Sequence, residues 1–162
     1  MDRLEKTRLL EDYSKGESLL RETLSTLPSA LMDFKPTPTR WSVREILVHL
    51  SDSEIQSHVR CRMIIAEPGS TIPNHDEYKW SVVLDYSHQD INMALATISL
   101  MRQCNHALLV SLPDPVWSNA CVHSVRGAIT LEDWLRTYAN HLHQHIAQIH
   151  RNLQAWHSTH GA

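Results

Sequence analysis

Four long stretches of this chain repeat apolar residues at the three- and four-residue spacing of amphipathic α-helices, and this pattern limits the fold more than any other feature. The stretches cover about residues 2–27, 41–67, 87–112 and 130–153. A helix of this size spans about 35 Å at 1.5 Å per residue. No run of alternating β-branched residues favours a sheet, so the sequence predicts an all-α fold.

Helix-start signals support these boundaries. Ser42 is followed three residues later by Glu45, and Thr130 is followed by Asp133. A hydroxyl and a carboxylate at this spacing can each accept a hydrogen bond from the other residue's backbone amide. Ser87 is expected to cap the third stretch. The second and fourth stretches therefore have the best defined starts.

The connections between the stretches carry the prolines and are long. They run over about residues 28–40, 68–86 and 113–129. Simple up-and-down bundles have shorter loops, so at least one connection is expected to cross over the bundle. No internal repeat divides the chain, and its 162 residues are expected to form a single domain.

Composition excludes several classes of protein. The net charge is -3 with scattered basic residues, which disfavours nucleic acid as a partner. No apolar run reaches the roughly 18 residues of a membrane span, and residues 1–6 open a polar amphipathic stretch rather than an apolar signal core, so we expect a soluble, cytoplasmic protein. Cys61, Cys104 and Cys121 are odd in number and widely spaced, which predicts reduced thiols.

Twelve histidines against one phenylalanine make metal binding the main functional question. With Leu142 at the centre of the apolar stripe, His145 lies about 60° and His141 about 100° to the same side. Two imidazoles four residues apart can reach one ion. His143 and His150 lie on the opposite flank and seven residues apart, where they cannot easily share an ion.

A third ligand is needed, and His49 is the candidate. It lies at the edge of the buried face of the second stretch, about 100° from Leu50. If the second and fourth helices are neighbours, His49 can reach His141 and His145 across the seam between them. The residues alone leave another interpretation open, in which His49 bonds a carbonyl in the core and the pair belongs to a solvated helix edge.

Three blocks of sequence resemble one known family. They are the block from Trp41 to Glu54, the segment Gly127–Leu131 followed by His141–Ile149, and the weaker match at Leu112–Trp117. These blocks are similar to the signatures of DinB/YfiT-like proteins, and the resemblance covers about residues 38–155.

The resemblance implies a four-helix bundle with up-down-down-up topology that is often a homodimer. It also implies a divalent metal ion bound by three histidines that match His49, His141 and His145. Nickel or zinc is expected, with manganese or iron as alternatives. Proteins of this family are described as metal-dependent hydrolases or as transferases that act on low-molecular-weight thiols.

Three imidazoles with an open coordination position are typical of catalytic rather than structural zinc. A metal ion in such a site can make hydroxide available for hydrolysis or can ionise a small substrate thiol for transfer. The alternative is a non-catalytic, ligand-binding or stress-response dimer with a vestigial metal site, because no general base is evident beside the ligands. Nucleic-acid binding is a weaker alternative that the acidic balance disfavours.

Several other residues are candidates for supporting roles. Glu45, Asp52 and Gln148 lie within a turn of the predicted ligands and could orient their rings. Arg60 lies on the His49 edge and could bind an anionic substrate group, or it could form a surface salt bridge. The polar stretch 74–77 could line the mouth of the site, or it could be an ordinary polar loop.

Overall fold

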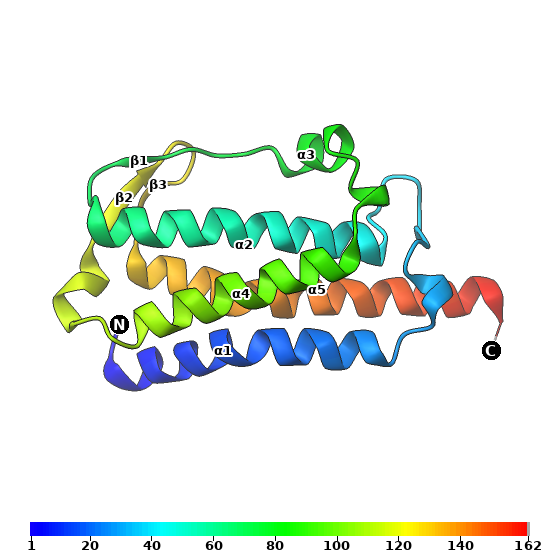
Figure 1. The fold of residues 1–162 in the computed structure, drawn as a ribbon, viewed down its shortest axis with the longest axis horizontal. Coiled ribbons are helices and arrows are strands. Elements are labelled where there is room, and N and C mark those ends of the chain that lie inside the picture. The colour runs from blue at the N-terminus through cyan, green and yellow to red at the C-terminus, as the bar shows by residue number, and fades with distance from the viewer. Residues whose placement is uncertain (162) are drawn as a thin grey trace.

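The computed structural model describes residues 1–161, and four long helices form most of it (Figure 1). The long helices are α1 (Arg3–Ser25), α2 (Val43–Ala66), α4 (Ile91–Leu109) and α5 (Leu131–His160). The shorter elements are α3 (Glu77–Val83), β1 (Thr71–Ile72), β2 (Ala120–His123), β3 (Gly127–Thr130) and the 3₁₀ turns Ser29–Leu31, Tyr86–His88 and Asp114–Ser118. The four predicted helices are therefore confirmed, and α3 is an addition.

The long helices are connected in an up-down-down-up order. In Figure 1 the chain runs in one direction along α1 and α5 and in the opposite direction along α2 and α4. Helix α2 packs against α4 and α5, and α1 packs against the same two helices. Because α2 and α4 are parallel, the chain between them returns along the length of the bundle. This return, over residues 67–90, is the predicted crossover.

The starts of α2 and α5 have the predicted reciprocal caps. The Ser42 hydroxyl accepts a hydrogen bond from the backbone amide of Glu45. A Glu45 carboxylate oxygen in turn accepts one from the backbone amide of Ser42 at 2.8 Å. Thr130 and Asp133 form the same pair of bonds. Each box satisfies amides that the first helical turn leaves without partners. The local sequence thus sets where the two helices of the candidate site begin.

The predicted start of the third helix was wrong by three residues. Asp90, not Ser87, caps α4, and its carboxylate accepts the backbone amides of Asn92 and Met93. Ser87 lies in a 3₁₀ turn, where its hydroxyl donates to Asp85. The local bond between Ser87 and Asp85 competes with a helix cap, as short polar side chains commonly do.

A small sheet lies at one end of the bundle, although no sheet was expected from the sequence. Strand β2 pairs antiparallel with β3 and parallel with β1. Val122 is paired with Thr71 on one side and with Ala128 on the other. These strands are too short to show an alternating pattern. Strand β1 follows the end of α2 and β3 directly precedes α5, and the antiparallel packing of these helices brings the strands together.

The predicted apolar stripe of α2 is buried. Its members are Val43, Ile46, Leu47, Leu50, Cys61 and Ile64, all fully buried. On α1, Tyr13 and Leu20 are fully buried, whereas Leu4 is 81% exposed although it is apolar. Leu4 lies in the first turn of α1, where the neighbouring Glu5 accepts a hydrogen bond from Arg136 of α5.

A buried ion pair lies at the centre of the bundle. Arg102 of α4 donates to a Glu54 carboxylate oxygen of α2 at 2.5 Å, and both side chains are almost completely buried. The same guanidinium donates to the backbone carbonyls of Tyr13 in α1 and Tyr138 in α5. One side chain of α4 thus contacts the other three long helices. Gly16 leaves room for it, since a Cβ atom there would lie 3.2 Å from Arg102 Nη2.

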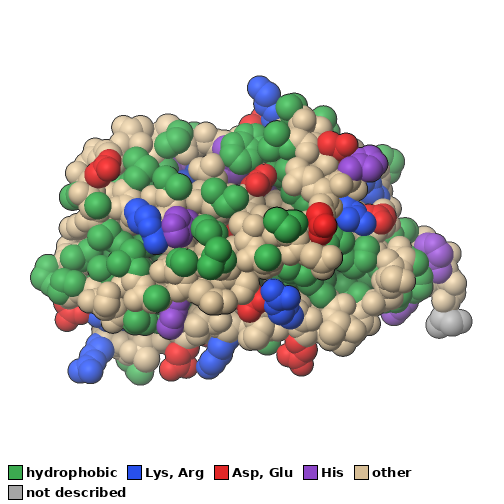
Figure 2. Space-filling model, in the orientation of Figure 1, with side chains coloured by type: hydrophobic (Ala, Val, Ile, Leu, Met, Phe, Trp, Pro, Cys, Tyr) green, Lys and Arg blue, Asp and Glu red, His purple; other side chains and the backbone are tan. Residues whose placement is uncertain are grey.

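The surface mixes charges and scattered apolar side chains. On the face shown in Figure 2, Lys and Arg side chains lie among Asp and Glu side chains and do not form one large cluster. None of the helices in residues 1–161 has both the length and the apolar character needed to cross a bilayer.

Replacing Arg102 with methionine tests the central ion pair. We expect Arg102→Met to lower the free energy of unfolding by about 3–5 kcal/mol, because Glu54 is left buried without its partner. The double variant Glu54→Leu/Arg102→Met should recover most of this loss, since it leaves no buried charge. Urea unfolding followed by circular dichroism measures both. A loss below about 1 kcal/mol in the single variant would contradict the assignment.

Candidate metal centre

Two hydrogen bonds set the register of α2 against α5. Trp134 Nε1 donates to the Ser57 carbonyl at 3.1 Å, and Asn152 Nδ2 donates to the Trp41 carbonyl at 2.9 Å. His49 lies between Trp41 and Ser57 in the chain, and His141 and His145 lie between Trp134 and Asn152, so the two bonds lie on either side of the three histidines. The register is therefore fixed on both sides of the candidate site.

The structure brings the three predicted histidines together. The Nε2 atoms of His141 and His145 lie 3.2 Å apart, and the ring centroid of His49 lies 4.8 Å from that of His145 and 5.7 Å from that of His141. One ligand atom from each ring lies within 4.8 Å of the other two. Among residues 1–161 this is the one group of three metal-ligating side chains that meets at a single point.

Burial keeps all three rings uncharged. Desolvation, with the neighbouring His145 and His141, lowers the pKa of His49 to about 2, and His49 is only 2% exposed. Desolvation, with His145 and the positive charges of Arg102 and Arg126, lowers the pKa of His141 to about 3. Burial also lowers the pKa of His145. Neutral imidazole is the form that binds metal, so the rings are ready to act as ligands.

Gln148 orients one of the rings. Its carboxamide oxygen accepts a hydrogen bond from His145 Nδ1 at 2.9 Å, so the proton of the neutral ring is on Nδ1 and the lone pair of Nε2 points to the other histidines. His141 Nδ1 is buried without a hydrogen-bond partner. The indole of Trp41 packs on His49 with 4.8 Å between ring centroids. The expected role of Gln148 thus agrees with its position.

The donor set fits a divalent transition metal. Tetrahedral zinc with bonds of 2.0–2.1 Å places neighbouring nitrogen ligands about 3.3 Å apart, close to the 3.2 Å between His141 and His145. Imidazole nitrogens suit zinc, nickel, copper and iron, whereas magnesium and calcium prefer oxygen. Three protein ligands would leave at least one coordination position for a substrate or water.

The other two predicted supporting residues bind elsewhere. Asp52 accepts a hydrogen bond from the Tyr86 hydroxyl, and Glu45 is held by its own cap and by Lys35 at 2.7 Å. Neither carboxylate has a hydrogen bond to a histidine of the site. Sequence distance placed them within a turn of His49, but their side chains point to other partners.

The crossover segment lies beside the histidines. The charge of His75 helps to lower the pKa of His49, and the charge of Glu77 opposes the lowering of the pKa of His145. Both residues are therefore within electrostatic reach of the site. The His75 ring packs on Trp80 with centroids 4.7 Å apart. Stretch 74–77 could line the mouth of the site or be an ordinary polar loop, and these positions favour the first interpretation.

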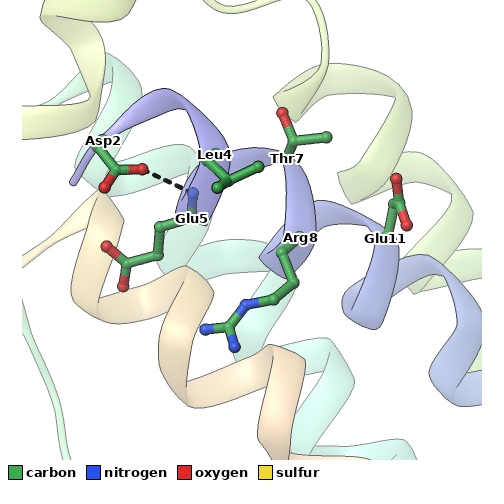
Figure 3. Close-up of a pocket in the computed structure, with 6 residues that line it drawn as sticks. All are labelled: Asp2, Leu4, Glu5, Thr7, Arg8 and Glu11. Carbon is green, nitrogen blue, oxygen red and sulfur yellow. Dashed lines mark hydrogen bonds between the residues drawn. The ribbon is translucent and has the colours of Figure 1, made fainter.

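A surface hollow at the start of α1 lies away from the three histidines and has no comparable group of metal-ligating side chains. Its volume is about 530 Å³, and it is lined by Asp2, Leu4, Glu5, Thr7, Arg8 and Glu11 (Figure 3). All of these residues belong to the start of α1, and Figure 3 shows their side chains spread along the helix. The hollow therefore brings together no groups from different elements.

The sequence from residue 12 to residue 149 matches the family model of the DinB superfamily. The chain belongs to the DinB superfamily. The resemblance predicted from the blocks at Trp41–Glu54 and His141–Ile149 is confirmed, because this match contains both.

Named relatives in the superfamily cover most of this chain. YfiT from Bacillus subtilis is 27% identical over 146 residues, which are 90% of this chain and 82% of YfiT. A relative from Oceanobacillus iheyensis is 28% identical over 131 residues, which are 81% of this chain and 76% of the relative. Both relatives carry the provisional name of metal-dependent hydrolase.

Two solved structures share the fold. The structure of YfiT matches with a TM-score of 0.87 and 26% identity, over 95% of this chain and 89% of YfiT, and is described as having an unusual four-helix-bundle topology. A mycothiol-dependent maleylpyruvate isomerase matches with a TM-score of 0.71 and 10% identity, over 89% of this chain and 60% of the isomerase. The second match shows a common fold alone.

The neutral histidines predict how the metal-free protein responds to acid. In the unfolded chain His49, His141 and His145 take up protons as the pH falls below about 6.5, whereas in the folded protein their lowered pKa values prevent this. Their contribution to stability is therefore complete above pH 6.5 and decreases below it. We expect the free energy of unfolding to fall by about 1.4 kcal/mol per pH unit for each histidine.

Urea unfolding at pH 7.5, 6.0 and 5.0 measures this slope, and His49→Gln should reduce it by the share of one histidine, about 1.4 kcal/mol per pH unit. The exposed His150 provides the control, because His150→Gln should leave the slope unchanged. Equal stability of the metal-free protein at pH 7.5 and 5.0 would contradict neutral, buried rings.

Proposed function

We propose that this protein is an enzyme that binds one divalent metal ion through His49, His141 and His145 and uses it to hydrolyse a small-molecule substrate. The observation that carries the proposal is the meeting of three neutral imidazole rings from two helices, with ligand atoms within 4.8 Å of one another. The names of the relatives, which describe metal-dependent hydrolases, support hydrolysis as the reaction class.

When bound, a divalent ion supplies Lewis-acid activation of a nucleophile and of the group under attack. The chain's own residues prepare the position for it. Desolvation of His49 and His141 holds both rings in the uncharged form, and the carboxamide of Gln148 holds the proton of His145 on Nδ1. The two hydrogen bonds between α2 and α5 hold the rings at one level of the bundle.

Transfer of a small thiol is the second candidate reaction. Three imidazoles carry no negative charge, so the full charge of the ion would stabilise a thiolate as well as a hydroxide. Nickel and zinc are the metals we propose first, with manganese and iron as alternatives.

A binding protein without turnover is the third possibility, since no carboxylate in residues 1–161 has a hydrogen bond to the three rings. The homodimer stays a prediction.

Metal content is the first test. We expect the purified protein, dialysed against Ni²⁺ or Zn²⁺ and then against buffer, to retain about one ion per chain, and His145→Ala to retain less than a tenth of that, because two rings bind far more weakly than three. His150→Ala, on the exposed side of the same helix, is the matched control and should retain the wild-type amount. Equal retention in both variants would overturn the site.

Turnover is the second test. We expect the metal-loaded protein to act on a panel of small esters and amides, and the activity to disappear with a chelator and return with added metal. A parallel panel of small thiols with electrophiles separates hydrolysis from thiol transfer. Metal binding without activity on either panel would favour the binding protein over the enzyme.

Gln148 provides a finer test of the same site. Gln148→Met removes the acceptor that orients His145 and should weaken zinc affinity about tenfold or more, as loss of such partners commonly does. Isothermal titration calorimetry measures the affinity. Gln144 lies one turn earlier on α5 with its side chain exposed, so Gln144→Met is the matched control and should bind zinc as the wild type does.

A further inference from the structure

A second, smaller cavity lies on the same α2–α5 seam as the histidines, beneath the three-stranded sheet. It has room for about 30 Å³ and is lined by Arg60, Ile64, Ile72, His123, Arg126, Ile129, Trp134, Thr137 and Tyr138. Two arginines, a histidine and a tyrosine therefore meet against an apolar wall. Both helices of the metal centre contribute to it, together with all three strands.

Arg60 has hydrogen-bonding capacity that the protein does not use. Its Nη2 atom donates to the Pro73 carbonyl at 3.0 Å and its Nη1 atom lies 3.4 Å from the Tyr138 hydroxyl, but its Nε atom is buried without a partner. Neither Arg60 nor Arg126 forms a salt bridge with any residue in the described part of the chain. The predicted alternative of a surface salt bridge for Arg60 is wrong.

His123 also presents a donor to this cavity. Its Nδ1 atom accepts hydrogen bonds from the backbone amides of Val125 and Arg126 at 3.2 and 3.3 Å, so Nδ1 carries no proton. Burial, with the charges of Arg60 and Arg126, holds the pKa of His123 below its usual value, and the residue is 3% exposed. The proton of the neutral ring is therefore on Nε2, which has no hydrogen-bond partner among residues 1–161.

The unused groups are all donors. The Tyr138 hydroxyl lies 3.4 Å from Arg60 Nη1, so its oxygen already faces a donor. A cavity with two unpaired guanidinium groups and no carboxylate among its lining residues favours an anion. Its size is two to three times the space of one water molecule, which suits a carboxylate group but not a whole metabolite.

The cavity and the metal centre are close enough to serve one substrate. Tyr138 precedes His141 by three residues on α5, and their ring centroids are 5.9 Å apart. The cavity and the histidines are thus about one turn of α5 apart.

We propose that Arg60, Arg126 and His123 bind a carboxylate of the substrate, so that the protein acts on small carboxylic acids whose reacting group lies at the histidine site. The assignment of the reacting end rests on the function proposed above. The anion site itself depends only on the residues that line the cavity.

Nuclear magnetic resonance of the full-length ¹⁵N-labelled protein tests the anion site, with sodium acetate as the ligand and acetamide as its neutral counterpart. At constant ionic strength we expect acetate to shift the Arg60 Nε–H and Arg126 amide resonances in a saturable manner, in both the metal-free and the zinc-loaded protein. Acetamide should produce no such shifts.

Matched arginine variants separate this cavity from general surface charge. Arg126→Gln should weaken acetate binding about tenfold, as loss of a charged donor does. Arg40 is also exposed and without a salt bridge but lines a separate hollow, so Arg40→Gln should bind acetate as the wild type does. Arg60→Gln, with its fold checked in the same spectra, should weaken binding at least as much as Arg126→Gln.

The outcomes distinguish the two proposals. If the wild-type protein fails to retain metal in the dialysis test but acetate still shifts the arginine resonances, the anion site is supported and the proposed function is overturned. Shifts confined to His49, His141 and His145, or equal effects of Arg126→Gln and Arg40→Gln, would overturn the anion site even if metal-dependent activity is found.

If hydrolysis is found, the substrate preference is a further measurement. An ester that carries a free carboxylate should have a kcat/KM about tenfold above that of the same ester with a primary amide in its place, mainly through KM. Arg126→Gln should lower kcat/KM for the carboxylate ester towards that of the amide form. Equal kcat/KM values in the wild type would contradict a carboxylate subsite that serves the metal centre.

Discussion

The guanidinium of Arg102 holds the centre of this bundle, because it joins α4 to groups of the other three long helices at once. A buried charge is tolerated only when its partners satisfy it, so the four helices must approach in one arrangement. Two of these partners lie near the metal centre in sequence: Glu54 follows His49 by five residues, and Tyr138 precedes His141 by three. The contact therefore constrains α2 and α5 close to the level where their histidines meet.

The same region is rich in positive charge and in hydrogen-bond donors. Arg102 and Arg126 both lower the pKa of His141, and Arg60 and Arg126 act in the same direction on His123. These positive charges help to keep the rings neutral, which is the form that binds a metal ion. The ion itself adds further positive charge to the region. An anionic substrate would offset it, so the donor-rich cavity and the histidines are complementary parts of one proposed site.

Topology brings the remaining groups to this region. Parallel α2 and α4 require a connection as long as the bundle, and that connection passes alongside α2 (Figure 1). Its residues Pro73, His75 and Glu77 lie beside Arg60 and the histidines. The sheet then closes the end of the α2–α5 seam and carries His123. A simple up-and-down bundle, with short loops between antiparallel neighbours, would have no segment at these positions.

The sequence by itself determined the helices, the caps at Ser42 and Thr130, and the shared edge of His141 and His145, because periodicity and caps depend on residues within about four positions. It also indicated Gln148, one turn from His145. Only the tertiary structure decided that His49 meets this pair, that the short strands pair, and that Arg102, at an apolar position of its helix between Ile98 and Leu109, is buried against Glu54. These contacts join residues tens of positions apart, where the local pattern carries no information about which helices are neighbours or in what register they pack.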